Sequence, residues 1–178
     1  MTFCFRFFHL SDLFLRSPLL PEYLVAAFAK RLARLALTGP AHTLTMVLQF
    51  IGNLLLRHPG LQKMANLGDG SASDDPYVME EPDPAKCQAG ESHLWEVAAL
   101  QSHALPQVAH AAKFIQKLDG STPIIQPEWN VNDLLENTYQ DMFEVETKKK
   151  VFVNVPLTFE KPDTFKFPKG EIVSSLFV

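Results

Sequence analysis

The sequence predicts an all-α fold in which helical hairpins stack as a fragment of an α-solenoid, with a long acidic loop and an extended C-terminal tail. Apolar residues recur every three or four positions through most of the first 60 residues and again after residue 92. Proline and glycine separate these periodic segments, and the alternation typical of strands is weak. The 178 residues have room for one domain, and a hydrophobic content of 47% excludes disorder throughout.

Charge and cysteine content exclude two further classes of protein. The formal net charge of −4 does not suit a polycation that coats nucleic acid. Two cysteines, Cys4 and Cys87, cannot form a disulfide framework, so nothing in the sequence demands an oxidising compartment.

The first 60 residues predict three helices. Residues 3–15 form a short helix rich in Phe and Leu, and Pro21 suits the first turn of a second helix over 22–37. Gly39-Pro40 then turns the chain into a third helix over 41–57, which Pro59 ends. Two helices joined by so short a link form an antiparallel hairpin.

The helix over 22–37 carries two candidate faces. At 100° per residue, one side collects the large apolar side chains of Leu24, Val25, Phe28, Leu32 and Leu35. Ala26, Ala29 and Ala33 form a strip of small residues beside them, which allows a neighbouring helix to approach closely. Lys30, Arg31 and Arg34 lie on the far side.

A long acidic segment follows this hairpin. Residues 69–96 hold eight acids against one lysine, whereas residues 1–60 hold six Lys or Arg against two acids. The same segment is rich in Pro and Gly, so residues 66–91 are predicted to be a flexible loop rather than a packed element.

Helical periodicity returns after the loop. We expect helices over 92–102, from Pro106 to about residue 118, and from Asn130, as N-cap, to about residue 143. The predicted organisation is a hairpin unit over 1–65, the loop over 66–91, a second helical unit over 92–147 and an extended tail over 148–178. Leu157 and Phe159 are candidate apolar anchors of the tail.

No constellation of catalytic residues emerges. The sequence has no CxxC or HxxxH pair for a zinc site, no G-x-S-x-G nucleophile turn and no glycine-rich phosphate loop. Acid pairs such as Glu80-Glu81 lie in the loop, where burial would not raise a carboxyl pKa. We therefore predict no catalytic residue, no metal site, no cofactor and no small-molecule substrate.

Two other interpretations remain open at this point. The basic stripe of Lys30, Arg31 and Arg34, with Arg57, would contact RNA phosphates without reading sequence, or it is simply a solvated helix face. Residues 35–56 carry no formal charge, so the hairpin over 22–57 is alternatively a membrane-associated element of the nuclear envelope.

The segment from Phe7 to Pro59, FFHLSDLFLRSPLLPEYLVAAFAKRLARLALTGPAHTLTMVLQFIGNLLLRHP, resembles the nucleolar complex proteins that share a CCAAT-binding-factor domain. DPY at 75–77, SHLWEVAALQSH at 92–103 and VPLTFE at 155–160 follow in the order expected of that family. The resemblance covers most of residues 7–160. Because the family's proteins are about three times as long, it implies a C-terminal part or a short isoform.

This resemblance implies a HEAT-like helical array and no catalytic activity. It implies a nucleolar and nuclear scaffold of small ribosomal subunit biogenesis, acting in the small-subunit processome, in pre-ribosomal RNA processing and in export of the pre-small subunit. The implied partners are nucleolar protein fourteen and other processome proteins, with pre-ribosomal RNA contacted weakly or indirectly.

The leading hypothesis is a non-enzymatic scaffold that docks a partner protein through apolar side chains. The predicted partner-binding residues are Leu24, Phe28, Leu32, Leu35, Leu157 and Phe159. The predicted secondary contacts to RNA phosphates are Lys30, Arg31, Arg34 and Arg57. A membrane-associated hairpin and a small hydrolase of unrecognised type are the rival hypotheses.

Overall fold

The computed structural model describes residues 2–66, 75–118, 128–136 and 138–148, and these residues are helical with irregular connections. No strand occurs in these ranges, so the predicted all-α fold is confirmed for them. The helices are α1 (Thr2–Leu15), α2 (Glu22–Ala36), α3 (Ala41–Arg57), α4 (Trp95–Leu100), α5 (Pro106–Gln116), α6 (Val131–Glu136) and α7 (Tyr139–Lys148), with 3₁₀ turns η1 (Pro59–Ala65) and η3 (Ala89–Glu91).

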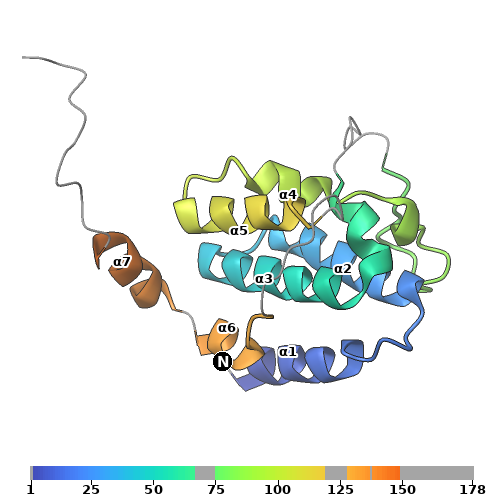
Figure 1. The fold of residues 1–178 in the computed structure, drawn as a ribbon, viewed down its shortest axis with the longest axis horizontal. Helices are drawn as coiled ribbons and strands as arrows, with labels where there is room; N and C mark the ends of the chain where they lie inside the picture. Colours follow the sequence, from blue (N-terminus) through green and yellow to red (C-terminus); the bar gives the residue numbers. More distant parts are fainter. Residues whose placement is uncertain (1, 67–74, 119–127, 137, 149–178) are drawn as a thin grey trace, which may run out of the picture. The chain divides into compact units, whose positions relative to one another are not determined.

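The helices of residues 2–136 stack in layers around α3 (Figure 1). α3 packs against its hairpin partner α2 and against α5, and α5 pairs in turn with α4. α1 and α6 contact each other, and the ring of Phe8 on α1 meets that of Phe50 on α3 edge to face. This stacking of successive hairpins is the arrangement of a HEAT-like array.

α3 is the central helix, and its burial follows from its composition. Side chains on nearly every side of it are buried, among them Leu48, Phe50 and Ile51, which are each at most 1% exposed. A helix that is apolar all round needs protein or lipid on all sides. Here α2, α5, α1 and α6 supply that surrounding surface.

The charge-free run over 35–56 is divided between two helices. α2 ends at Ala36, and α3 begins at Ala41 after the Gly39-Pro40 turn. Within the part of the chain that the structure describes, none of the helices has both the length and the apolar character needed to cross a bilayer.

Two segments between residues 75 and 102 differ from the expectations. The helix predicted over 92–102 is shorter, because the backbone at Ser92 and Leu94 is held outside the helical region by contacts with other segments. Residues 75–91 were expected to remain unpacked, but Tyr77, Cys87 and Ala89 are buried in the core. That part of the prediction was wrong because composition does not show which side chains of a Pro-rich segment find a partner.

The last predicted helix is divided in two. Asn130 caps α6 as expected, since its side-chain oxygen accepts the N–H of Asn132 at 3.1 Å. Thr138 then begins α7 through a reciprocal cap, in which its N–H donates to the Asp141 carboxylate and its hydroxyl accepts the Asp141 N–H. The tail over 149–178, including Leu157 and Phe159, lies outside the described residues.

Candidate functional site

The rotation of α2 about its axis decides which of its side chains reach the surface. The alanine strip packs against the core, with Ala29 fully buried and Ala33 only 1% exposed. The opposite side of the helix carries Leu24, Phe28, Arg31 and Leu35 at spacings of four, three and four residues, and we call this row the α2 outer face. Because the alanine strip faces the core, the large apolar side chains of the α2 outer face are left half-buried or exposed.

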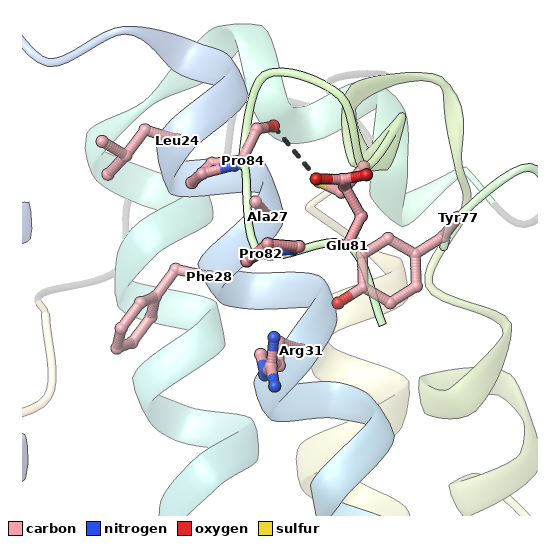
Figure 2. Close-up of a pocket in the computed structure, with 9 residues that line it drawn as sticks. Leu24, Ala27, Phe28, Arg31, Tyr77, Glu81, Pro82 and Pro84 are labelled. Atoms are coloured by element: carbon pink, nitrogen blue, oxygen red, sulfur yellow. Dashed lines mark hydrogen bonds between the residues drawn. The ribbon is translucent and has the colours of Figure 1, made fainter. Parts of the chain in front are cut away.

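A half-open cavity of about 220 Å³ lies beside the α2 outer face, and Figure 2 shows the residues around it. α2 forms one wall, and the irregular segment that precedes η3 forms the other. We call this cavity the α2 pocket. Its lining residues are Leu24, Ala27, Phe28, Arg31, Tyr77, Glu81, Pro82, Pro84 and Cys87.

The α2 pocket has one basic and one acidic end. Arg31 lies at the C-terminal end of the α2 wall, and the Glu81 carboxylate lies nearer the level of Leu24 (Figure 2). The Arg31 guanidinium makes a long contact of 3.4 Å to the Met79 carbonyl oxygen, and Glu81 accepts the N–H of Asp83 at 3.2 Å. Both charged groups therefore line the cavity with weak contacts to neutral backbone groups.

Four charged side chains hold the second wall of the pocket against α2. They are Lys30 and Arg34 of α2, Asp75 and Glu96, and we call them the α2 ion cluster. Lys30 Nζ lies 3.0 Å from an oxygen of each carboxylate, and Lys30 also donates to the His93 carbonyl oxygen. Two cations facing two carboxylates leave the cluster formally neutral, which buried charges require.

Arg34 completes the cluster from the next turn of α2. Its Nη2 lies 2.9 Å from Asp75 Oδ2, and its Nε lies 2.7 Å from Glu96 Oε1 without the alignment of a hydrogen bond. The guanidinium carbon lies 4.6 Å from the centroid of the Trp95 ring. This cation–π contact adds a further attraction between α2 and α4.

Asp75 is the most heavily hydrogen-bonded member of the cluster. Besides the two cations, it accepts from the Ser92 hydroxyl, from Trp95 Nε1 at 2.8 Å and from the Tyr77 N–H at 3.2 Å. Burial alone would raise its pKa, but the hydrogen bonds from Ser92, Lys30 and Trp95 outweigh burial and hold the pKa of Asp75 well below its usual range.

The pKa of Glu96 is shifted in the opposite direction. Its side chain has no exposed surface, and burial raises the pKa of Glu96 above its ordinary value against the opposing attraction of Lys30 and Arg34. The pKa values of the two carboxylates therefore shift in opposite directions, because the Ser92 hydroxyl and Trp95 Nε1 donate to Asp75, whereas the neutral donor of Glu96 is its own backbone N–H.

The pocket and the ion cluster both lie within a region that matches a known family. Residues 3–112 match the family model described as CBF: CBF/Mak21 family. The chain belongs to the CBF/Mak21 family. The resemblance to the CCAAT-binding-factor domain proteins inferred from the sequence is thereby confirmed.

Curated relatives agree with this membership. The chain is 49% identical over 173 residues to Nucleolar complex protein 4 homolog A of Xenopus laevis, covering 97% of this chain and 32% of that protein. It is 51% identical over 155 residues to Nucleolar complex protein 4 homolog of Mus musculus, covering 86% and 29%. For the Homo sapiens homolog the identity is 48% over 173 residues, covering 97% and 33%. The chain spans about a third of the length of these relatives.

The four basic residues predicted to contact RNA phosphates do not form a continuous basic surface in this CBF/Mak21 chain. The Lys30 side chain is fully buried, so its prediction as an RNA contact was wrong. Arg34 is paired with Asp75 and Glu96, and Arg57 is paired with Asp12 at 2.6 Å and Glu128 at 2.7 Å. Arg31 is exposed and has no ion-pair partner among the described residues.

The four predicted partner-binding residues on α2 differ in their exposure. Leu24 and Phe28 line the α2 pocket, and Leu35 is 52% exposed on the α2 outer face. Leu32 is only 8% exposed and packs in the core, so its side chain is not available to a partner. Leu32 was assigned to the binding surface because all large apolar side chains of α2 were treated as one face. In the structure this face is divided, since Val25 and Leu32 are buried in the core while Leu35 is exposed.

The carboxylate partners of Lys30 and Arg34 were not predicted from the sequence. Asp75 was counted with the acidic loop, and Glu96 was taken as one acid among eight. A signal was nevertheless present in two of the short motifs that carry the family resemblance, DPY at 75–77 and SHLWEVAALQSH at 92–103. These motifs contain Asp75, Tyr77, Ser92, Trp95 and Glu96.

The rival hydrolase hypothesis gains no support from Ser92 and Cys87, a serine and a cysteine that are both buried. The Ser92 hydroxyl donates to Asp75, and the Cys87 thiol donates to the Pro84 carbonyl oxygen at 3.2 Å. Both groups are engaged with oxygen acceptors rather than with an imidazole base.

Proposed function

We propose that this chain is a non-catalytic helical scaffold of nucleolar small ribosomal subunit biogenesis, acting in the small-subunit processome, in pre-ribosomal RNA processing and in export. The membership of the CBF/Mak21 family carries this proposal, together with relatives that are named nucleolar complex proteins. The proposed location is accordingly the nucleolus and nucleus.

The proposed partner is nucleolar protein fourteen, bound to the α2 outer face. Support comes from the half-buried Leu24 and Phe28 beside an open cavity and from the exposed Leu35. Stacking of the Phe7 ring on Phe28, at 6.2 Å between centroids, extends this apolar surface onto α1. An apolar surface of this kind is typical of a protein interface.

Pre-ribosomal RNA would be reached chiefly through that partner. Three of the four cations that were candidates for phosphate contacts are paired with carboxylates, so few charges remain to bind a phosphate backbone. The tail residues Leu157 and Phe159 are proposed as a second contact to the protein partner.

The test is a pull-down from nucleolar extract with the tagged chain, followed by immunoblotting for nucleolar protein fourteen and quantification of precursor small-subunit RNA. We expect both to be recovered, and we expect RNase treatment to remove the RNA while the protein stays bound. The double variant Leu24→Ser/Phe28→Ser should lose the partner, whereas Leu105→Ser, which changes an exposed leucine at the start of α5, should retain it.

Three results would contradict the proposal. These are failure to recover nucleolar protein fourteen, its loss on RNase treatment, and equal recovery by the Leu24→Ser/Phe28→Ser variant. The tail is tested separately, because Leu157→Ala/Phe159→Ala should weaken recovery if these residues are anchors.

A further inference from the structure

We infer that the α2 pocket receives a single aliphatic or aromatic side chain of a partner segment that directs a carboxylate toward Arg31 and a basic side chain toward Glu81. This inference rests on the proposed docking function and specifies the chemistry of the partner. Four features of the pocket support it, namely its volume, its walls, its two charged ends and the way in which its second wall is held.

The volume of the pocket suits one side chain. Sites for cofactors and drug-sized ligands enclose about 300–1,000 Å³, whereas an apolar cavity of about 150 Å³ holds one benzene ring. At about 220 Å³, the α2 pocket accommodates one leucine or phenylalanine side chain with some space to spare. The occupant is therefore expected to be a protein side chain rather than a separate small molecule.

The walls of the pocket are apolar and stiff. Leu24 and Phe28 extend from one side of α2, and Pro82 and Pro84 approach from the opposite segment (Figure 2). Proline has a fixed φ, so the second wall has little freedom to collapse into the cavity. A preformed wall lowers the entropy that binding would otherwise cost.

The two ends of the pocket differ in charge, and this difference defines what flanks the apolar anchor. Among the described residues, the Arg31 guanidinium and the Glu81 carboxylate have neutral backbone groups as their hydrogen-bond partners. The exposed Glu80 adds negative charge beside Glu81. A partner segment with an acid on one side of its anchor and a base on the other would pair the acid with Arg31 and the base with Glu81. The reversed order would place the base beside Arg31 and the acid beside Glu81, and both pairs would repel.

The second wall is held in place by buried ion pairs. Asp75 precedes the pocket segment and Glu96 follows it, and both are bound to Lys30 and Arg34 on α2. The pocket therefore exists in the chain without a partner, because these ion pairs hold its second wall against α2.

The experiment measures fluorescence anisotropy of labelled synthetic peptides titrated with the full 178-residue chain. The peptides have a central leucine, phenylalanine or alanine, flanked by glutamate and lysine in either order or by glutamine on both sides. We expect the leucine and phenylalanine peptides with one order of charges to bind about tenfold more tightly than the alanine peptide. The reversed order and the glutamine peptides should bind more weakly.

Charge reversal tests the ends of the pocket without altering its core. Arg31→Glu should make lysine preferable at the flank where the wild-type chain prefers glutamate, and Glu81→Lys should reverse the preference at the other flank. Lys113→Glu, on the exposed surface of α5, is the matched control and should leave both preferences unchanged. Ala27→Phe should fill the pocket and abolish the difference between leucine and alanine peptides, with thermal unfolding as the check that it folds.

Equal binding of leucine and alanine peptides would overturn the inference, as would peptide preferences unaffected by either charge reversal. The nucleolar pull-down separates this failure from failure of the proposed function. If the Arg31→Glu and Ala27→Phe chains recover nucleolar protein fourteen as well as wild type, the pocket is not the docking site and the scaffold proposal stands. If the wild-type chain does not recover it, the scaffold proposal itself fails.

Discussion

The Lys30 ammonium group lies 3.0 Å from the Glu96 carboxylate, with both side chains fully buried and 66 residues apart in the sequence. Removing two charges from water costs several kcal/mol per ion, which only close pairing and further hydrogen bonds offset. In this CBF/Mak21 chain the offset comes from Asp75, Arg34 and the His93 carbonyl group. These polar contacts join α2 to α4 and to the segment that precedes α4.

Replacement of Lys30 by methionine should destabilise the fold strongly. The variant leaves two buried carboxylates with Arg34 as their remaining cation, and loss of one partner of a buried pair costs about 3–5 kcal/mol. Urea denaturation followed by circular dichroism measures the loss. Arg31→Met, one position along on the exposed side, is the control and should change the free energy of unfolding by less than about 0.5 kcal/mol. If Lys30→Met lowered the free energy of unfolding no more than Arg31→Met does, the predicted contribution of the α2 ion cluster to stability would be wrong.

Asp75→Asn should reduce the dependence of stability on acid pH. Because the folded pKa of Asp75 lies below its ordinary value of 3.8, ionised Asp75 stabilises the fold above that pH and this contribution disappears as the pH falls through the folded pKa. The wild-type chain should therefore lose more free energy of unfolding between about pH 5 and pH 3 than the variant does. Glu96 contributes with the opposite sign, since its raised pKa favours the folded state on protonation, and it is present in both chains.

Asp83→Asn serves as the control for that comparison. Hydrogen bonding to the Ala85 N–H lowers the pKa of Asp83, but the group is exposed and pairs with Lys86 in a solvated contact of 3.4 Å. Such contacts contribute little to stability. An Asp75→Asn chain whose pH profile matched that of wild type would contradict the predicted role of Asp75.

Gly52→Ala should disturb the contact between α3 and Trp129. A Cβ at residue 52 would lie 2.8 Å from Cζ3 of Trp129, closer than carbon atoms pack. Overpacking costs about 1–3 kcal/mol and exceeds the gain of about 1 kcal/mol in helix propensity. Thermal unfolding and tryptophan fluorescence should both change, whereas Gly90→Ala, where a Cβ would meet no atom within 4 Å, should alter neither. A more stable Gly52→Ala chain would contradict the observed packing.

Asn53→Leu should release the segment that leads into α6. The Asn53 amide donates to the Trp129 carbonyl oxygen at 2.8 Å and accepts the Trp129 N–H at 2.9 Å, so its side chain pairs with both backbone groups of one residue. Leaving partly buried backbone groups unpaired costs about 1–3 kcal/mol. Amide hydrogen exchange at Trp129 should accelerate in this variant, but not in Gln49→Leu, one turn earlier on the same helix. Unchanged exchange would show that water replaces the lost contacts.

Local sequence patterns predicted the ends of a helix well where adjacent residues determine those ends. The third helix was predicted over 41–57 and lies at Ala41–Arg57, because a Gly-Pro turn begins it and Pro59 ends it. Asn130 was likewise identified as a cap. In contrast, the break before Thr138 was missed, because a threonine in helical register fits both a helix interior and a capping position.

Which side of α2 faces the core was not decided by its own composition. The sequence by itself determined an amphipathic helix with one row of large apolar residues, one of small residues and one of basic residues. It did not determine which row faces the core and which row faces a partner or solvent. Only the tertiary structure showed that the alanine row is buried in the core, that Lys30 is buried beside Asp75 and Glu96, and that Leu24 and Phe28 remain at an open pocket. The physical reason is that close packing and charge pairing between residues far apart in the sequence decide how a helix is rotated about its axis. Neither kind of contact can be detected in the local periodicity of the sequence.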